Sequence, residues 1–442
     1  MLLLTRSGAP AVRTGIYVLV VLTAGAYLPS PLYPGYQEAL GFSDLTMTLI
    51  YATFALVSAP ALVLCGSASD ALGPRGMLRA GVLAAAVGTG CFALASGPTW
   101  LVAGRAAQGI ALGAATGAAS ALIGSHATAS NRAGGTGLAG TAFVAGTAMG
   151  PILGGLLAQY APAPRVLPFV LHLVLLWFAW RAVSALPAPP VPGARRWKPT
   201  RPRVPAGMRP LFATAALTGF LAWTVAGLFL SVIPALLNYA AHTNLAVTGG
   251  VLGAVLVCSV LTQPLVPRIG SRSAQLAGLA AMFGSLALLA LTVGGSPPAT
   301  LLAAIIAGAG HGLAYGGATA AVERGTPARQ RGAVTGALYL AFYLGAGGPA
   351  IAIGLLTLGL PLPAATFWVA AAAAVLVPPA AAAVARFGEP RRGPAQAVTR
   401  AAVPVPRTAR RHPLASRWNH GGRSKKVSSA TTASVAETPG TS

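Results

Sequence analysis

Residues 211–236 read LFATAALTGFLAWTVAGLFLSVIPAL, a stretch without a single charged side chain. About 20 largely apolar residues in a helix are enough to cross the hydrocarbon core of a bilayer. Eleven further runs of this kind occur, so the sequence predicts an all-α membrane protein with twelve transmembrane helices. The predicted spans are residues 13–32, 45–65, 77–96, 99–121, 136–158, 166–185, 211–236, 246–266, 274–294, 299–321, 332–357 and 363–385.

The composition supports a membrane location. Of the 442 residues, 55% are hydrophobic and only 8% are charged, whereas soluble domains carry about 25% charged residues. Lys and Arg number 30 against six acids, which gives a formal charge of +24. These basic residues lie in short segments between the apolar runs and after the last one, which favours a membrane protein over a nucleic-acid partner.

The basic residues also predict the orientation. Cytoplasmic loops carry an excess of Lys and Arg, and one side of the predicted topology holds nearly all of them, with only Arg165 opposite. We therefore expect an integral plasma (inner) membrane protein with both termini in the cytoplasm. The basic residues on that side are Arg6, Arg13, Arg75, Arg79, Arg132, Arg195, Arg196, Lys198, Arg201, Arg203, Arg209, Arg268, Arg272, Arg324, Arg329 and Arg331.

The span pattern divides the chain into two six-helix halves. We predict a cytoplasmic N-terminus (1–12), a first half (13–186), a basic Pro-rich linker (187–210), a second half (211–386) and a basic tail (387–442). The tail has little apolar surface to bury, so we expect it to be disordered.

Similar spacings of Gly and Pro recur in both halves and predict that the halves are pseudo-symmetric repeats, an arrangement typical of transporters. The corresponding segments are Gly137-x8-Gly146 with Gly336-x8-Gly345, Gly150-Pro151 with Gly348-Pro349, and Gln108-Gly109 with His311-Gly312.

A polar segment follows the second span, with Gly66, Asp70, Gly73 and Arg75 in the sequence GSASDALGPR. Gly73 permits a tight turn, and Asp70 can pair with an Arg or with a helix N-terminus of the facing half. These four residues predict a conformational latch. The alternative is an ordinary polar loop with one acid.

The fourth span contains Arg105-Ala-Ala-Gln108-Gly109. A charge inside the bilayer costs about 2.5–3.5 kcal/mol on insertion scales and by default marks function. Arg105 and Gln108 are three residues apart and share one helix face, so we predict that both line the substrate or proton pathway. Alternatively, Arg105 extends to the membrane surface, because it lies near the start of its helix.

The fifth span contains Gly137-x8-Gly146-x3-Gly150-Pro151-x2-Gly154. The last three of these glycines recur every four residues, so they share a face that a partner helix can approach closely. Pro151 removes one backbone hydrogen bond. We predict a helix-packing motif, with generic small-residue packing as the alternative.

These three segments resemble signatures of the major facilitator superfamily, at the places where that family carries them. The Arg-x-x-Gln-Gly match is the most specific, and the fifth-span motif is similar to the signature of proton-coupled drug efflux antiporters. The loop departs from the family pattern, because Ala71 stands where a basic residue is usual after the acid. The resemblance covers residues 13–385. It implies alternating access, with small molecules, protons and membrane lipids as partners and no cofactor or metal, and we expect a monomer.

Proton coupling normally needs a titratable group inside the bundle, and no acid is predicted in mid-span. The candidates are His311, near the middle of the tenth span and opposite Gln108 by pseudo-symmetry, and His172 in the sixth span. Histidine can change its charge near neutral pH. For each, a neutral packing histidine is the alternative.

The sequence predicts a secondary active transporter that exports small amphipathic compounds in exchange for protons. The alternative is an uptake carrier for a nutrient or an organic anion, which Arg105 would suit. A non-transporting receptor or scaffold is less favoured, because no folded soluble domain is predicted. We expect no enzyme, since the chain has neither His-Glu-x-x-His nor Gly-x-Ser-x-Gly.

Overall fold

Twelve helices in the described part of the chain are long and apolar enough to cross a membrane, and those residues include no strand. This confirms the predicted all-α membrane fold. The structure is a computed structural model that describes residues 9–125, 132–187, 204–241, 244–293, 295–326 and 331–388. The predicted tail beyond residue 388 and linker residues 188–203 lie outside these ranges.

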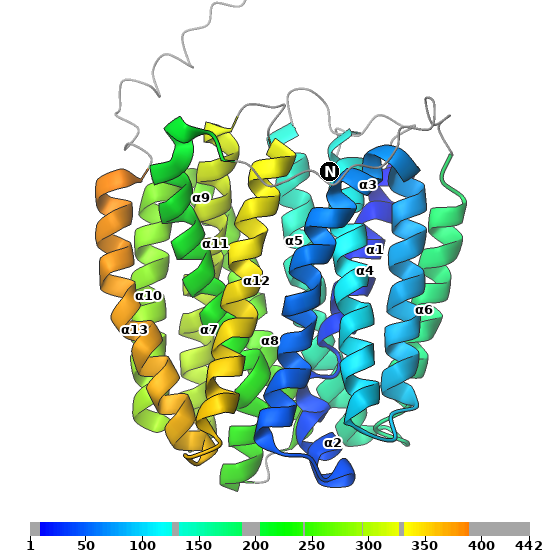
Figure 1. Cartoon of the computed structure of the whole chain (residues 1–442), viewed down its shortest axis with the longest axis vertical. Coiled ribbons are helices and arrows are strands. Elements are labelled where there is room, and N and C mark those ends of the chain that lie inside the picture. Colours follow the sequence, from blue (N-terminus) through cyan, green and yellow to red (C-terminus); the bar gives the residue numbers. More distant parts are fainter. Residues whose placement is uncertain are drawn as a thin grey trace, which may run out of the picture. The chain divides into compact units, whose positions relative to one another are not determined.

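The helices of the first half are α1 (Ala9–Tyr27), η1 (Ser30–Leu32), α2 (Tyr33–Leu40), α3 (Asp44–Ala93), α4 (Pro98–Ser125), α5 (Arg132–Tyr160) and α6 (Leu167–Ser184). Those that follow are η3 (Ala206–Met208), α7 (Arg209–Ala241), α8 (Leu245–Thr262), η4 (Gln263–Leu265), α9 (Val266–Ile269), α10 (Ser271–Thr292), α11 (Pro297–Gly325), α12 (Arg331–Leu356) and α13 (Leu362–Phe387). Figure 1 labels most of them along the bundle.

The first span is broken rather than ended by its prolines. Pro29 and Pro31 have no backbone N–H to continue the ladder of α1, so that helix stops at Tyr27 and the short helix η1 follows. After η1 the chain forms the short helix α2, which belongs to the same span. The first span therefore covers Pro10–Leu40, eight residues beyond its predicted end at residue 32.

The second and third spans form one long helix, α3, with a kink at Gly73, where φ is 72° and ψ is 161°. The segment 66–72, which the sequence predicts to be a loop, has a helical backbone. Glycine adopts a positive φ without strain, so the chain can reverse its direction at this one residue. The membrane-capable parts of α3 are Asp44–Cys65 and Gly73–Ala93.

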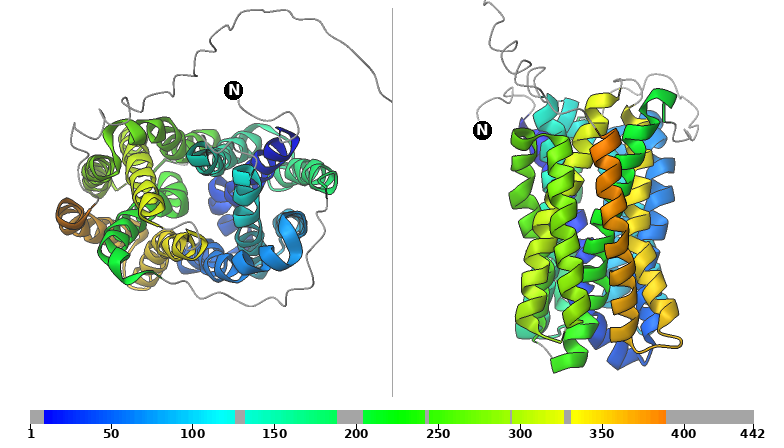
Figure 2. Two further views of the ribbon diagram at one scale, coloured as in Figure 1. Left: turned by 90° about the horizontal axis from the view of Figure 1, so that it is seen from above. Right: turned by 90° about the vertical axis from the view of Figure 1, so that its left-hand side faces the viewer.

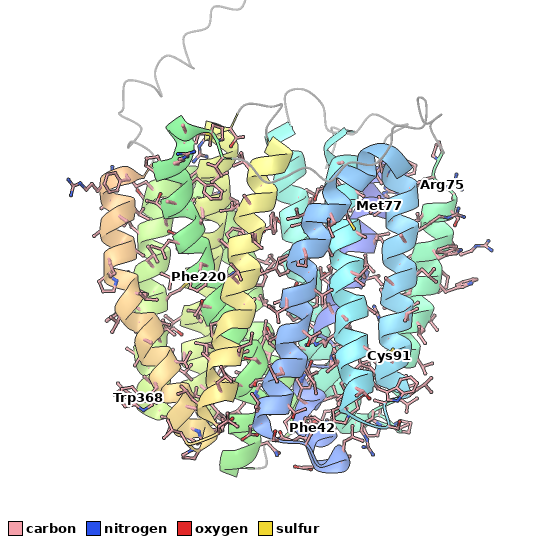
Figure 3. The ribbon with its side chains drawn as sticks, viewed as in Figure 1. Phe42, Arg75, Met77, Cys91, Phe220 and Trp368 are labelled. Atoms are coloured by element: carbon pink, nitrogen blue, oxygen red, sulfur yellow. The ribbon has the colours of Figure 1, made fainter. Side chains whose placement is uncertain are left out.

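The two ends of the bundle differ in charge. The end that holds Glu38 and Asp44 is called the acidic end here, and the end that holds Arg75, Arg79 and Arg272 the basic end. Figure 3 places Arg75 and Phe42, a neighbour of Asp44 in sequence, at opposite ends of the bundle.

The halves meet along two helix pairs, α3 with α12 and α5 with α8. Seen along the bundle, helices of the first half (blue to teal) lie on one side and those of the second (green to orange) on the other (Figure 2). Several close contacts lie near the acidic end: a β-carbon on Gly155 would lie 2.4 Å from the carbonyl oxygen of Leu245, and one on Gly354 would lie 2.0 Å from Oγ1 of Thr48. Small residues thus let the halves touch there almost backbone to backbone.

Two glycines of the first half make helix contacts like those of the corresponding glycines in the second half. A β-carbon on Gly109 of α4 would meet the Phe54 carbonyl of α3 at 2.9 Å, and one on Gly312 of α11 would meet the Ser259 carbonyl of α8 at 2.3 Å. In the same way Gly146 of α5 approaches α1, and Gly345 of α12 approaches α7.

Candidate functional site

Arg105 is fully buried, with 0% of its side chain exposed. The alternative that it extends to the membrane surface is therefore wrong. Its Nη1 donates to the carbonyl oxygen of Ala26 and to Oε1 of Gln108 at 3.1 Å, and its Nε donates to the Tyr33 hydroxyl at 2.5 Å. Arg105 thus ties α4 to both sides of the break in the first span.

The break explains why a charge is stable here. The last carbonyl groups of a helix have no partner within the helix and carry a partial negative charge. Nε2 of Gln108 donates to the Gly25 carbonyl at 3.1 Å, next to the Ala26 carbonyl that Arg105 binds. The Arg105–Gln108 pair therefore satisfies the end of α1.

Four aromatic rings surround the guanidinium of Arg105. Its central carbon lies 5.4 to 5.9 Å from the ring centroids of Tyr33, Tyr51, Phe54 and Phe92, within range of cation–π attraction. The Nη2 atom has no hydrogen-bond partner among the described residues. Both N–H groups of this nitrogen are therefore free to bind a ligand or a water molecule.

His172 of α6 also lies against the end of α1. Its Nε2 is 3.0 Å from the Val21 carbonyl oxygen and its Nδ1 is 2.8 Å from the Thr89 hydroxyl. A carbonyl oxygen only accepts, so Nε2 carries the proton. Gly25 leaves the space for the ring, because a β-carbon there would lie 1.9 Å from Cε1 of His172. Since both nitrogens are bonded, the packing alternative is favoured for His172.

His311 of α11 is 0% exposed, and its two nitrogens differ. Nδ1 lies 2.8 Å from the Ser259 hydroxyl of α8, whereas Nε2 has no hydrogen-bond partner among the described residues. The imidazole stacks on Tyr315, with centroids 5.5 Å apart and planes at 10°, and meets Trp223 of α7 edge-on at 5.1 Å and 87°.

Aromatic contacts also connect the rings around His311 with the first half. Trp223 touches Phe143 of α5, with ring centroids 6.4 Å apart, and Phe54 of α3 touches Tyr343 of α12 at 6.3 Å. The indole Nε1 of Trp223 likewise has no partner among the described residues. We call Phe143, Trp223, His311, Tyr315 and Tyr339 the aromatic centre; the last two are joined by a hydrogen bond of 3.2 Å between their hydroxyls.

Of the four predicted pathway residues, Arg105, Gln108 and His172 gather around the end of α1, while His311 lies in the second half. The contacts of Arg105 come from α1, α2, α3 and α4, and those of His311 from α7, α8 and α11. Sequence reasoning missed Trp223 and Ser259. Trp223 could have been noticed as a polar-tipped aromatic residue in the middle of the uncharged run 211–236.

The predicted latch is described only in part, because the surroundings of Gly66 and the side chain of Asp70 lie outside what the structure describes. Gly73 provides the kink of α3. Arg75 donates from Nη2 to the Ser184 carbonyl at 2.6 Å, and Ser184 ends α6 of the same half.

The glycine motif of α5 packs directly on α1. β-Carbons on Gly146, Gly150 and Gly154 would lie 2.5, 2.4 and 2.2 Å from the carbonyl oxygens of Val20, Ala24 and Leu28. Pro151 lies inside α5, and Gly137 falls outside the described side chains. The motif therefore holds α1 and its broken end in place.

Hydrogen bonds join the halves at the acidic end. Asn238 of α7 donates to Oε1 of Glu38 at 3.1 Å, and the Leu245 backbone N–H of α8 donates to Oε1 of Gln159 at 2.8 Å. Glu38 is exposed, so this end is held by polar contacts that water can replace.

The family profile of the Major Facilitator Superfamily matches residues 16–349. Two uncharacterized MFS-type transporters of Mycobacterium tuberculosis, from the strains CDC 1551 / Oshkosh and ATCC 25618 / H37Rv, are each 28% identical to the chain over 179 residues. The matched segment covers 40% of this chain and 26% of each relative.

Proposed function

This chain belongs to the Major Facilitator Superfamily, and from that membership we propose that it is a secondary active transporter that exports small amphipathic compounds in exchange for protons. The aromatic centre is the observation that carries the proposal. It lies about midway along α7 and α11, and it joins the two halves through Phe143 and Trp223. It also holds two buried nitrogens that have no hydrogen-bond partner among the described residues. Buried polar atoms in a membrane protein are costly and by default mark a functional site.

Alternating access requires two halves that separate at one end while they close at the other. The acidic end is closed by glycine contacts and by side-chain hydrogen bonds such as that of Asn238 with Glu38. Corresponding glycine contacts in the two halves support the pseudo-symmetry that such a motion needs.

His311 is the residue we propose to carry the transported proton. Among the described side chains no carboxylate is buried: Glu38 is exposed, and Asp44 and Glu323 are half-buried. His311 is buried in the second half against Trp223, which contacts Phe143 of the first half, and its Nε2 has no hydrogen-bond partner among the described residues.

Direction and orientation rest on sequence. The charge asymmetry supports a cytoplasmic location of the basic end, and we propose that the acidic end faces outward and that substrates enter from the cytoplasm. The motif of Gly146, Gly150 and Gly154, similar to that of efflux antiporters, supports export.

Everted membrane vesicles with a preset proton gradient test this function. A panel of amphipathic compounds is added, and dissipation of the gradient is followed with a pH-sensitive dye. We expect at least one compound to release protons through the parent protein and not through His311→Gln, which keeps hydrogen bonding but does not titrate in this range. His172→Gln should retain the release. Loss in His172→Gln instead would move the coupling to that residue, and release by both variants would refute coupling by His311.

A further inference from the structure

The two buried nitrogens that lack a hydrogen-bond partner among the described residues, Trp223 Nε1 and His311 Nε2, lie on rings that touch each other. Trp223 is 5% exposed and His311 0%, and their centroids are 5.1 Å apart. The indole N–H can only donate. A buried donor without a partner is unfavourable, so a ligand that brings an acceptor to Nε1 of Trp223 gains a hydrogen bond in a place that strengthens it.

The hydrogen-bonding role of His311 depends on Ser259. When Nδ1–H donates to the Ser259 hydroxyl, at 2.8 Å, the neutral ring leaves a lone pair on Nε2, which then accepts. In this tautomer, on which the proposal below is built, the site presents one donor, from Trp223, and one acceptor, from His311. Tyr315 stacks on the imidazole at 10°, so the aromatic surroundings of His311 suit a planar ring.

The charges around His311 disfavour a cationic ligand. Its direct ring and hydrogen-bond partners, Trp223, Ser259 and Tyr315, are all uncharged. Among the described side chains, Arg105 is the one formally charged residue in the buried interior, and it is positive. A permanent cation would therefore enter without a buried counter-charge. Among the described side chains, the other titratable or charged residues on α11 and on the helices packed against it are Tyr315, Glu323, Arg324, Arg209, Cys258, Arg268, Arg272, Tyr339 and Tyr343.

We propose that the substrate is a neutral planar aromatic molecule with a hydrogen-bond acceptor for Trp223 Nε1 and an adjacent N–H or O–H donor for His311 Nε2. Aromatic carboxamides and lactams have this chemistry. The inference rests on the proposed function and names its substrate class.

This arrangement couples proton and substrate at one atom. A proton that enters adds to the lone pair of Nε2, and the resulting imidazolium carries N–H there, so it cannot accept the donor of the substrate. When the proton leaves, the lone pair returns and the substrate binds. The site therefore holds either a proton or a substrate, never both. Such mutual exclusion is what the exchange of protons for substrate requires, and here it needs no buried carboxylate.

Three naphthalene probes test the proposal on the full chain in lipid nanodiscs without a proton gradient. The first, 2-naphthamide, has both donor and acceptor; N,N-dimethyl-2-naphthamide has the acceptor alone; (2-naphthylmethyl)trimethylammonium is a permanent cation. Ligand-observed NMR titrations give the dissociation constants. We expect 2-naphthamide to bind about tenfold more tightly than its dimethyl analogue, a typical effect of one buried hydrogen bond, and the cation to bind most weakly.

Two variants locate the site. Trp223→Phe removes the N–H and keeps a ring, so it should weaken 2-naphthamide binding about tenfold. Trp177→Phe is the matched control, because Trp177 is 55% exposed on α6, and it should leave binding unchanged. Acidification should weaken 2-naphthamide binding to the parent protein, and His311→Gln should lose this dependence while Glu323→Gln keeps it.

Equal affinity of the two amides for the unaltered protein, or tightest binding of the cation, would overturn the proposal, and neither measurement requires a variant to fold. The proposed function fails separately. Binding with the expected preferences but no gradient-driven export would refute the function alone, whereas proton-coupled export by a protein without these preferences would refute the substrate class alone.

Discussion

Gly150→Ala adds one methyl group at a point where α5 contacts the backbone of the first span directly. The new β-carbon would lie 2.4 Å from the carbonyl oxygen of Ala24, 3.0 Å from the backbone nitrogen of Leu28 and 3.0 Å from the carbonyl carbon of Tyr27. All three neighbours are backbone atoms of the first span, so no side chain can rotate away. The helices must instead move apart at the point where Arg105 and Gln108 hold the end of α1.

Gly348→Ala is the matched control. Both glycines lie inside a helix directly before a proline, Pro151 or Pro349, but a β-carbon on Gly348 would meet nothing within 4 Å. The gain in helix propensity, about 0.5–1 kcal/mol, is common to both substitutions. The difference between the variants is then the overpacking term, about 1–3 kcal/mol.

Unfolding in mixed micelles, followed by circular dichroism as SDS is added, gives the two free energies. We expect Gly150→Ala to be the less stable variant by about 1–3 kcal/mol and to transport more slowly, and Gly348→Ala to equal or exceed the parent in stability. Equal stability of the two variants would mean that α1 and α5 do not pack as described.

Arg105→Lys keeps the charge but loses the forked donors that bind Ala26, Gln108 and Tyr33, so unfolding titrations should show a loss of about 1–3 kcal/mol; parental stability would contradict the assigned hydrogen bonds. Asp70→Asn should leave membrane levels normal and slow transport in vesicles, because it removes the latch charge and keeps the shape, whereas a parental rate would make Asp70 an ordinary polar residue. Truncation after Glu389 should leave transport largely intact, since the removed segment has no apolar periodicity, and an inactive but inserted truncation would give the tail a regulatory or lipid-binding role.

Span positions were predictable because length and apolarity decide them. The run 211–236 became α7, Arg209–Ala241, and the run 363–385 became α13, Leu362–Phe387. The breaks were harder to predict. The first span does not end at Pro29 and Pro31, because the chain continues beyond them as α2. The segment 66–72 is helical rather than a loop, because Gly73 alone makes the turn.

Burial of Arg105 was one of two alternatives that the sequence left open, and its partners could not be predicted. A single sequence does not reveal which carbonyls a neighbouring helix leaves free, and the acceptor at Ala26 exists only because α1 ends at Tyr27. The partners of His311 were hidden for the same reason, since Ser259 and Trp223 lie on different helices, 52 and 88 positions before it in the chain.

Reversible closure of the acidic end tests the alternating-access account most directly. A β-carbon on Gly354 would lie 3.2 Å from the β-carbon of Thr48 across the two halves, close to the spacing of about 3.5–4.5 Å found in disulfides. Thr48→Cys with Gly354→Cys is made after the native cysteines, Cys65, Cys91 and Cys258, are replaced by serine. Alternating access predicts that oxidation stops proton-driven transport and that a reductant restores it. Undiminished transport by the fully cross-linked protein would show that the acidic end need not open, and would contradict the account.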